Sequence, residues 1–315
     1  MAPKILITGG TGYIGGTVLD TLVKQHPEYE ITALLRNLPS NFTALYPNVK
    51  VVRGDYDSWD AISDAASKAD VVVHNDNSDH EPSIKAIVAG LLKLADWKDA
   101  VYHGKLNPKT WNHGGKLKTA IVCPPDIYGP GRGPGNTASV FLSAFFDEIV
   151  GTIGAPFYGG EGTNTRSWVH IEDLVQLYSR LIEAAVAGVV KRPGELRYVA
   201  GSEDGDSGYY FAASQEHSQR GMAEKTAAVI KKHELWPLTE IVQVSLEVLD
   251  GSMQGWGIPH IGTYMFAANS RPRADRAAKE LGYVPSAPSL LDVIEHDLLV
   301  AAQKKQRTFA GVQIK

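Results

Sequence analysis

Short apolar runs alternate with longer helical stripes over the first 125 residues of the chain. Lys4–Thr8 and Asp70–His74 are almost continuously apolar, as expected of strands buried on both faces of a parallel sheet. Tyr13–His26 and Pro82–Trp97 instead place apolar residues three and four positions apart, which predicts helices. The six predicted strands are Lys4–Thr8, Glu30–Leu35, Lys50–Arg53, Asp70–His74, Ala100–His103 and Lys118–Cys123. Strands that alternate with helices in this way predict an α/β fold with a doubly wound parallel sheet.

The pattern changes after Cys123. The segment Pro124–Asn136 is so rich in proline and glycine that we expect a shaped loop. Helical patterns return at Thr137–Val150, Ile171–Ala187, His217–Lys232, Arg273–Leu281 and Leu290–Gln303, and Leu196–Ala200 is a further predicted strand. We therefore expect a larger domain from residues 1–123 and 167–200, and a smaller, mostly helical C-terminal lobe from residues 124–166 and 201–315.

The strongest chemical signal is a glycine motif between the first predicted strand and the first predicted helix. It reads Thr8-Gly9-Gly10-Thr11-Gly12-Tyr13-Ile14-Gly15. Gly9 would allow a tight turn, Gly12 would let a pyrophosphate approach the backbone, and Gly15 would let the helix pack on the strand. The larger domain is therefore predicted to be a Rossmann dinucleotide-binding domain, although a purely structural turn is the alternative. The candidate cofactor-binding residues here are Gly9, Thr11, Gly12, Tyr13, Ile14 and Gly15.

The end of the second predicted strand bears on the choice of cofactor. NAD-binding domains usually place a carboxylate there, about 20 residues after the motif, to accept a hydrogen bond from the ribose 2′-hydroxyl. This chain has Ala33-Leu34-Leu35-Arg36-Asn37 instead, with no acid and with Arg36 available to a 2′-phosphate. NADP(H) is therefore the first choice of cofactor and NAD(H) the second, unless Arg36 is simply a solvated side chain.

Charge and cysteine content exclude several other classes of protein. The 31 basic and 35 acidic side chains give a formal charge of −4, and no basic run indicates binding to nucleic acid. Cys123 is the only cysteine, and the spacing of His74, His103 and His170 matches no metal-binding motif, so we expect no metal. With no signal-peptide pattern and no apolar stretch long enough to span a membrane, we expect a cytoplasmic protein without a membrane partner.

Several motifs together resemble the extended or atypical short-chain dehydrogenases/reductases, in particular the fungal NAD(P)-binding, NmrA-like and NAD-dependent epimerase/dehydratase-like members. The glycine motif is one of them. The others are Arg53–Asp57, Val71–Asn75, Pro124–Gly131 and Trp168–Leu174. The resemblance implies that Asp55, with Tyr56 beside it, contacts the adenine, and that His74 and Asn75 lie beside the cofactor. It also implies that Pro124–Gly131 borders the nicotinamide and the substrate.

The family's catalytic Tyr-x-x-x-Lys pair is missing. Of the thirteen tyrosines only Tyr46 has a lysine four positions later, Lys50, and Pro47 lies between them, so this is a chance match. The connection 105–117 is too short and too rich in proline and glycine for the catalytic helix. Real divergence, a mis-spliced gene or an omitted segment would each explain the gap. Lys105 and Tyr128 are the nearest candidates for proton transfer, and if they serve, Tyr128→Phe should abolish turnover.

These observations predict an NADP(H)-binding oxidoreductase or isomerase that acts on a small-molecule carbonyl or alcohol. The alternative is an NmrA-like NADP-binding sensor or a vestigial homologue without turnover. We expect a small-molecule substrate and a possible homodimer as partners. Arg271, Arg273 and Arg276 precede or begin a predicted helix, where sugar-nucleotide members of the family hold phosphates, although a solvated helix start explains them equally well.

Overall fold

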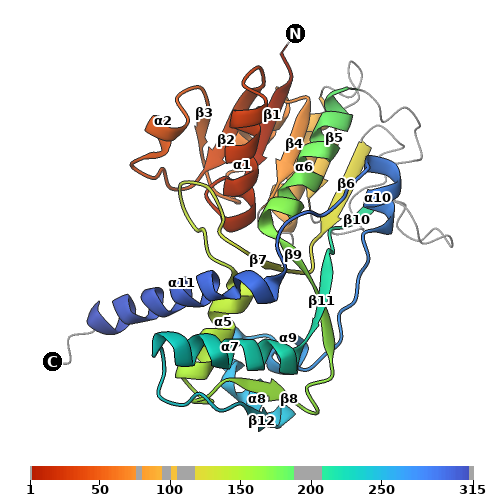
Figure 1. Ribbon diagram of the computed structural model, residues 1–315. Helices are drawn as coiled ribbons and strands as arrows, with labels where there is room; N and C mark the ends of the chain where they lie inside the picture. Colours follow the sequence, from red (N-terminus) through yellow and green to blue (C-terminus); the bar gives the residue numbers. More distant parts are fainter. Residues whose placement is uncertain (1, 76–79, 94–100, 105–117, 188–207, 312–315) are drawn as a thin grey trace.

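The computed structural model describes residues 2–75, 80–93, 101–104, 118–187 and 208–311 (Figure 1). Its central sheet has seven strands, all paired in parallel, in the order β10-β6-β5-β4-β1-β2-β3. The strands are β1 (Lys4–Thr8), β2 (Glu30–Leu35), β3 (Lys50–Arg53), β4 (Val71–His74), β5 (Val101–Gly104), β6 (Lys118–Cys123) and β10 (Tyr209–Phe211). The doubly wound parallel sheet is confirmed, and the ends of its first six strands agree with the sequence pattern within one residue.

Helices cover both faces of this sheet. Helices α1 (Tyr13–Gln25) and α6 (Ile171–Val186) lie together on one face, in front of the sheet in Figure 1. Helices α3 (Trp59–Ala66) and α4 (Glu81–Leu92) pack together against the other face, and the short α2 (Phe42–Leu45) precedes β3. Successive side chains of a strand point to opposite faces, which is why Ile5 and Ile7 join the core under α1 while Leu6 joins the core under α3.

The smaller lobe has its own core, lined by aromatic rings. Its elements are α5 (Val140–Val150), β8 (Phe157–Gly159), α7 (Gln219–His233), β12 (Val242–Val244), α8 (Leu246–Ser252), the 3₁₀ turn Gln254–Trp256, α9 (Ile261–Phe266) and α11 (Leu290–Gly311). Phe141, Phe145, Phe157 and Phe266 pack edge to face or tilted, with ring centroids 4.8–5.7 Å apart. Helix α10 (Asp275–Leu281) packs back on α6 and β10.

A three-stranded sheet lies between the two cores. It consists of β7 (Asp126–Tyr128), β9 (Thr165–His170) and β11 (Gln215–Ser218), in the order β11-β9-β7. Strand β7 lies within the segment expected to be a loop. Its partner β9 begins some forty residues further along the chain, so no local pattern announces the pairing.

The expected boundary between the two lobes does not coincide with the edge of the large sheet. Strand β10 belongs to the range assigned to the smaller lobe but extends the large sheet, so we propose a boundary after Phe211. The strand expected at Leu196–Ala200 and the connection with Lys105 lie outside the described residues. In the described part of the chain, no helix is both long and apolar enough to cross a membrane.

Candidate functional site

The glycine motif forms a tight turn that leads into α1. Gly9 has a φ of +69°, in the left-handed region that favours glycine, and its carbonyl accepts a hydrogen bond from the Gly12 N–H at 2.9 Å. A Cβ atom on Gly15 would lie 2.3 Å from the Gly9 oxygen, so a larger residue cannot pack there. Gly12 precedes α1 without a side-chain cap, and the first turn of the helix carries no acid. The helix start is therefore open to an anion such as a pyrophosphate.

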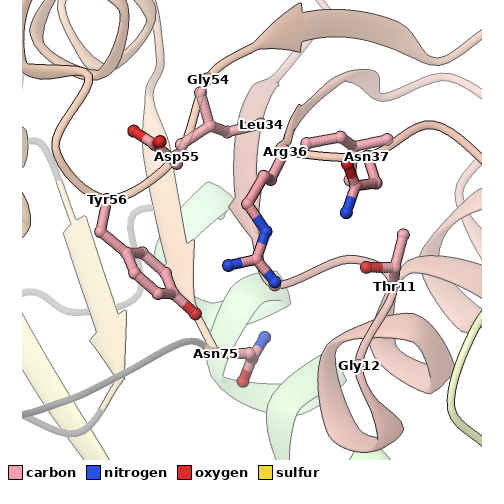
Figure 2. Close-up of a pocket in the computed structure, with 11 residues that line it drawn as sticks. Thr11, Gly12, Leu34, Arg36, Asn37, Gly54, Asp55, Tyr56 and Asn75 are labelled. Carbon is pink, nitrogen blue, oxygen red and sulfur yellow. The ribbon is translucent and has the colours of Figure 1, made fainter.

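A cavity of about 230 Å³ opens beside this turn (Figure 2). Its lining brings together seven of the residues expected to bind the cofactor: Gly9, Thr11, Gly12, Arg36, Asp55, Tyr56 and Asn75. Figure 2 shows the Arg36 guanidinium directed into the space between Tyr56, Thr11 and Asn75. Arg36 is exposed and takes part in no ion pair with another described residue. Its charge is therefore available to an anionic ligand in this cavity.

Asp55 lies in the cavity wall, but its carboxylate serves the local turn. Its Oδ1 accepts hydrogen bonds from the Ser58 hydroxyl at 2.8 Å and from the Asp57 N–H at 3.1 Å. The Ser58 hydrogen bond lowers the pKa of Asp55, which therefore stays ionised. Figure 2 shows this carboxylate turned away from Arg36, while the Tyr56 ring points into the cavity.

Asn75 follows β4 and lies at the junction of this cavity with a second one. Both polar atoms of its amide are buried and have no hydrogen-bond partner among the described residues. Buried amides are nearly always paired, so this one indicates a polar ligand group. The preceding His74 lines neither cavity, and its Nδ1 lies 2.6 Å from the Thr8 hydroxyl. His74 thus supports the turn, while Asn75 faces the space where a cofactor would lie.

The second cavity is larger, about 620 Å³, and lies between the two lobes. It shares Gly12 and Asn75 with the first cavity, and Tyr13 and Ile14 also line it. The segment after β6 contributes Pro124, Pro125, Asp126 and Ile127, as the family resemblance implies. From the smaller lobe come Phe141, Trp256, Ile261, Tyr264 and Met265.

An ion pair is built into the wall of the second cavity. Arg166 donates to both carboxylate oxygens of Asp126, at 3.1 Å from its Nη2 to Oδ1, and to the Tyr264 carbonyl at 2.8 Å. The arginine is only 5% exposed, and its guanidinium lies over the Phe141 and Tyr264 rings. Burial raises the pKa of Asp126 despite the arginine beside it. The pair therefore holds β7, β9 and α9, which carry Asp126, Arg166 and Tyr264, in place relative to one another in the cavity wall.

Tyr128 lies in neither cavity wall, contrary to the expectation that it borders the substrate. Its side chain is completely buried, its hydroxyl donates to the Pro288 carbonyl at 2.6 Å, and the Gln215 amide donates to it. Burial raises the pKa of the Tyr128 hydroxyl above its usual value, so this hydroxyl gives up its proton less readily. These contacts give Tyr128 a packing role and leave its proposed role in proton transfer without support. Its presumed partner Lys105 lies outside the described residues.

The only Tyr-x-x-x-Lys match lies in the wrong place for catalysis. The Tyr46 hydroxyl donates to Asp20, and its burial beside that carboxylate raises the pKa of Tyr46 to about 12. Lys50 is exposed and pairs with Glu30 at 3.1 Å. Neither residue lines either of the two cavities described above, which agrees with the interpretation of this spacing as a chance match.

The second half of the proline- and glycine-rich segment, from Arg132 to Asn136, crosses the glycine turn, and no sequence motif predicted its contacts. Arg132 donates to Asp20, Thr21 and Glu172, and its backbone N–H donates to Thr17. The Asn136 N–H donates to the Thr11 carbonyl at 3.0 Å. The proline- and glycine-rich composition predicted a shaped segment, but its contacts depend on residues 40 or more positions away along the chain.

Comparison with known proteins shows which families this chain resembles. Residues 1–102 match the model of the NmrA-like family, and residues 103–201 match that of the NAD dependent epimerase/dehydratase family. Solved structures with the same fold include the PbgP3 protein from Burkholderia pseudomallei (14% identity, TM-score 0.61, 96% of this chain and 99% of that chain). A UDP-glucose 4-epimerase from Thermotoga maritima, solved with UDP-glucose, has 15% identity and a TM-score of 0.58 over 97% and 99% of the two chains. The chain has the fold of the extended short-chain dehydrogenases/reductases. The resemblance drawn from its motifs is thereby confirmed.

A curated relative covers nearly the whole chain. The oxidase ucsJ of Acremonium sp is 25% identical over 96% of this chain and 99% of its own length. That alignment has 356 positions and this chain has 315 residues, so at least 41 positions face a gap in this chain.

Proposed function

We propose that this protein binds NADP(H) and acts as an oxidoreductase or isomerase on a small-molecule carbonyl or alcohol. The observation that carries the proposal is the junction of the two cavities at Gly12 and Asn75. The smaller cavity has the size and the polar wall for an adenosine, and the open start of α1 fits the pyrophosphate. The nicotinamide would then lie in the larger cavity, beside Asn75 and the Pro124–Ile127 wall.

The preference for NADP(H) over NAD(H) rests on Arg36. Its guanidinium points into the smaller cavity, and the residues at the end of β2 include no acid that would accept from a ribose hydroxyl. Among the structural neighbours, a UDP-glucuronic acid 4-epimerase from Bacillus cereus was solved with NAD. A cationic residue at this position distinguishes the present site from one that selects a free 2′-hydroxyl.

When bound, the nicotinamide ring supplies a hydride acceptor or donor. This chain must supply the proton transfer, and the usual Tyr/Lys pair is absent from its sequence. General acid–base groups typically contribute about 10²–10⁴-fold, so we expect turnover to be slower than in a complete member of the family. The same absence favours the second candidate function, a dinucleotide-binding sensor or vestigial homologue that does not turn over.

The test is NADPH oxidation over a panel of aldehydes and ketones, run beside calorimetric titrations of NADPH and NADH. Tight NADPH binding with slow, substrate-dependent oxidation supports the oxidoreductase. Tight binding with no oxidation of any substrate favours the sensor. A protein that binds neither dinucleotide would contradict both candidates.

A further inference from the structure

The wall of the larger cavity that faces away from the glycine turn is apolar and aromatic. Phe141, Trp256, Ile261, Tyr264 and Met265 come from three separate segments of the smaller lobe and meet there. Trp256 and Tyr264 leave 47% and 58% of their surfaces exposed, although large aromatic side chains usually gain free energy from burial. Neighbouring large apolar groups exposed at one cavity mouth are typical of a binding surface.

The two charged residues in the described wall of this cavity are already paired with each other. Arg166 donates to both oxygens of Asp126 and to the Tyr264 carbonyl. To bind a diphosphate, the arginine would have to leave a buried carboxylate unpaired, and breaking a buried ion pair is strongly unfavourable. The described part of the wall therefore offers no free cation to a nucleoside diphosphate.

The arginines that might have held such phosphates also lie elsewhere. Arg271 pairs with Glu216 at 2.8 Å, Arg273 with Asp275 at 3.2 Å and Arg276 with Glu280 at 3.0 Å. None of these three arginines lines either cavity. All three charges are paired with carboxylates, and the Arg276 guanidinium also lies over the Tyr210 ring.

We infer that the substrate is a neutral carbonyl or alcohol compound with an aromatic or aliphatic body, and that this site does not take a nucleotide sugar. This inference rests on the proposed function, because it assigns the larger cavity to the substrate. The Trp256 and Tyr264 rings would cover the apolar body at the mouth of the cavity. The reacting carbon would point inward toward Gly12 and Asn75, where the two cavities join.

The experiment compares ligands on the full-length protein, with and without saturating NADPH. The probes are neutral aryl ketones, 2-acetylnaphthalene and benzophenone, and UDP-glucose, each titrated by calorimetry. Variants Trp256→Ala and Tyr264→Ala remove rings at the mouth, where their exposure leaves the core intact. The matched control is Trp59→Ala, since Trp59 begins α3, is 44% exposed and lines neither cavity.

We expect at least one ketone to bind tenfold or more tightly than UDP-glucose. One aromatic contact contributes about 0.5–1.5 kcal/mol, so each mouth variant should weaken ketone binding roughly three- to tenfold. Trp59→Ala should bind as the parent does. Tighter binding of UDP-glucose, failure of both ketones to bind, or equal effects of Trp256→Ala and Trp59→Ala would each overturn the inference. NADPH titrations of the same samples keep this failure distinct, because a parent protein that binds NADPH but none of these ketones would overturn only the inference about the substrate.

Discussion

Replacing Arg36 with alanine should reduce the preference for a 2′-phosphorylated ligand. The guanidinium points into the smaller cavity, where it faces Tyr56, Thr11 and Asn75 and has no carboxylate partner among the described residues. A 2′-phosphate on an adenosine bound there would lie within reach of this charge. The alanine variant keeps the backbone of the cavity wall and removes only the cation.

The size of the effect follows from the exposure of Arg36. A hydrogen bond to a charged group contributes about 1.5–3 kcal/mol when shielded from water, whereas an exposed ion pair contributes about 0–1 kcal/mol. Arg36 is exposed but faces a cavity, so we expect about 1 kcal/mol, which corresponds to roughly a fivefold change in affinity. Raising the salt concentration should shrink this difference, because exposed charges are screened.

The assay compares 2′,5′-ADP with 5′-ADP, which isolates the contribution of the 2′-phosphate from the nicotinamide half. Calorimetric titrations of the parent and of Arg36→Ala should show the ratio of the two affinities falling about fivefold in the variant. Arg53→Ala is the control, since Arg53 ends the neighbouring strand β3, is exposed and does not line the cavity. An unchanged ratio in Arg36→Ala, or an equal drop in Arg53→Ala, would refute the assignment.

Three further changes test the supports of the site. Gly15→Ala should destabilise the fold by about 1–3 kcal/mol and weaken dinucleotide binding, because its Cβ would lie 2.3 Å from the Gly9 oxygen. Gly16→Ala is the control, since its Cβ would have its nearest contact at 3.4 Å, and urea denaturation should show that this variant is tolerated. Tyr128→Phe should cost about 1–3 kcal/mol of stability through the unpaired Pro288 carbonyl and leave NADPH affinity unchanged; a specific loss of turnover would restore its catalytic role. Burial lowers the pKa of His170, so the unfolded chain binds more protons than the folded one. The free energy of unfolding should therefore fall as the pH drops below about 6.5. His170→Asn keeps an acceptor for the Glu172 N–H at the start of α6 and should flatten this pH dependence between pH 5 and 7.

The smaller cavity, which we propose for the nucleotide, could be predicted from the sequence because its signals are local. Each strand of the large sheet is a short apolar run, and the carboxyl ends of neighbouring parallel strands meet at one edge. Residues that follow β1, β2, β3 and β4 therefore come together even though more than sixty positions separate the first from the last. Gly12, Arg36, Tyr56 and Asn75 all line the cavity as expected.

The larger cavity, which we propose for the substrate, could not be predicted in the same way. Its wall combines Asp126, Arg166 and Tyr264, which meet only through the pairing of β7 with β9 and the packing of α9. Because these residues lie far apart in the sequence, no periodicity of apolar positions predicts that they meet. The exposed Trp256 likewise belongs to no motif and to no apolar periodicity. The sequence places Tyr128 beside a pocket motif but does not show that its hydroxyl donates to the carbonyl of Pro288, a residue 160 positions away.

A calorimetric titration of NADPH into the parent protein and into Gly12→Val tests the central claim most directly. Gly12 lies where the two cavities join, and a Cβ there would already be 3.2 Å from the Gly9 oxygen, so a valine would fill the space assigned to the pyrophosphate. Gly251→Val is the control, because a Cβ at Gly251 meets no atom within 4 Å. We predict saturable one-to-one binding to the parent and to Gly251→Val, and none to Gly12→Val with its sheet still folded by circular dichroism. Equal NADPH binding by the parent and Gly12→Val, or none by the parent, would contradict the account.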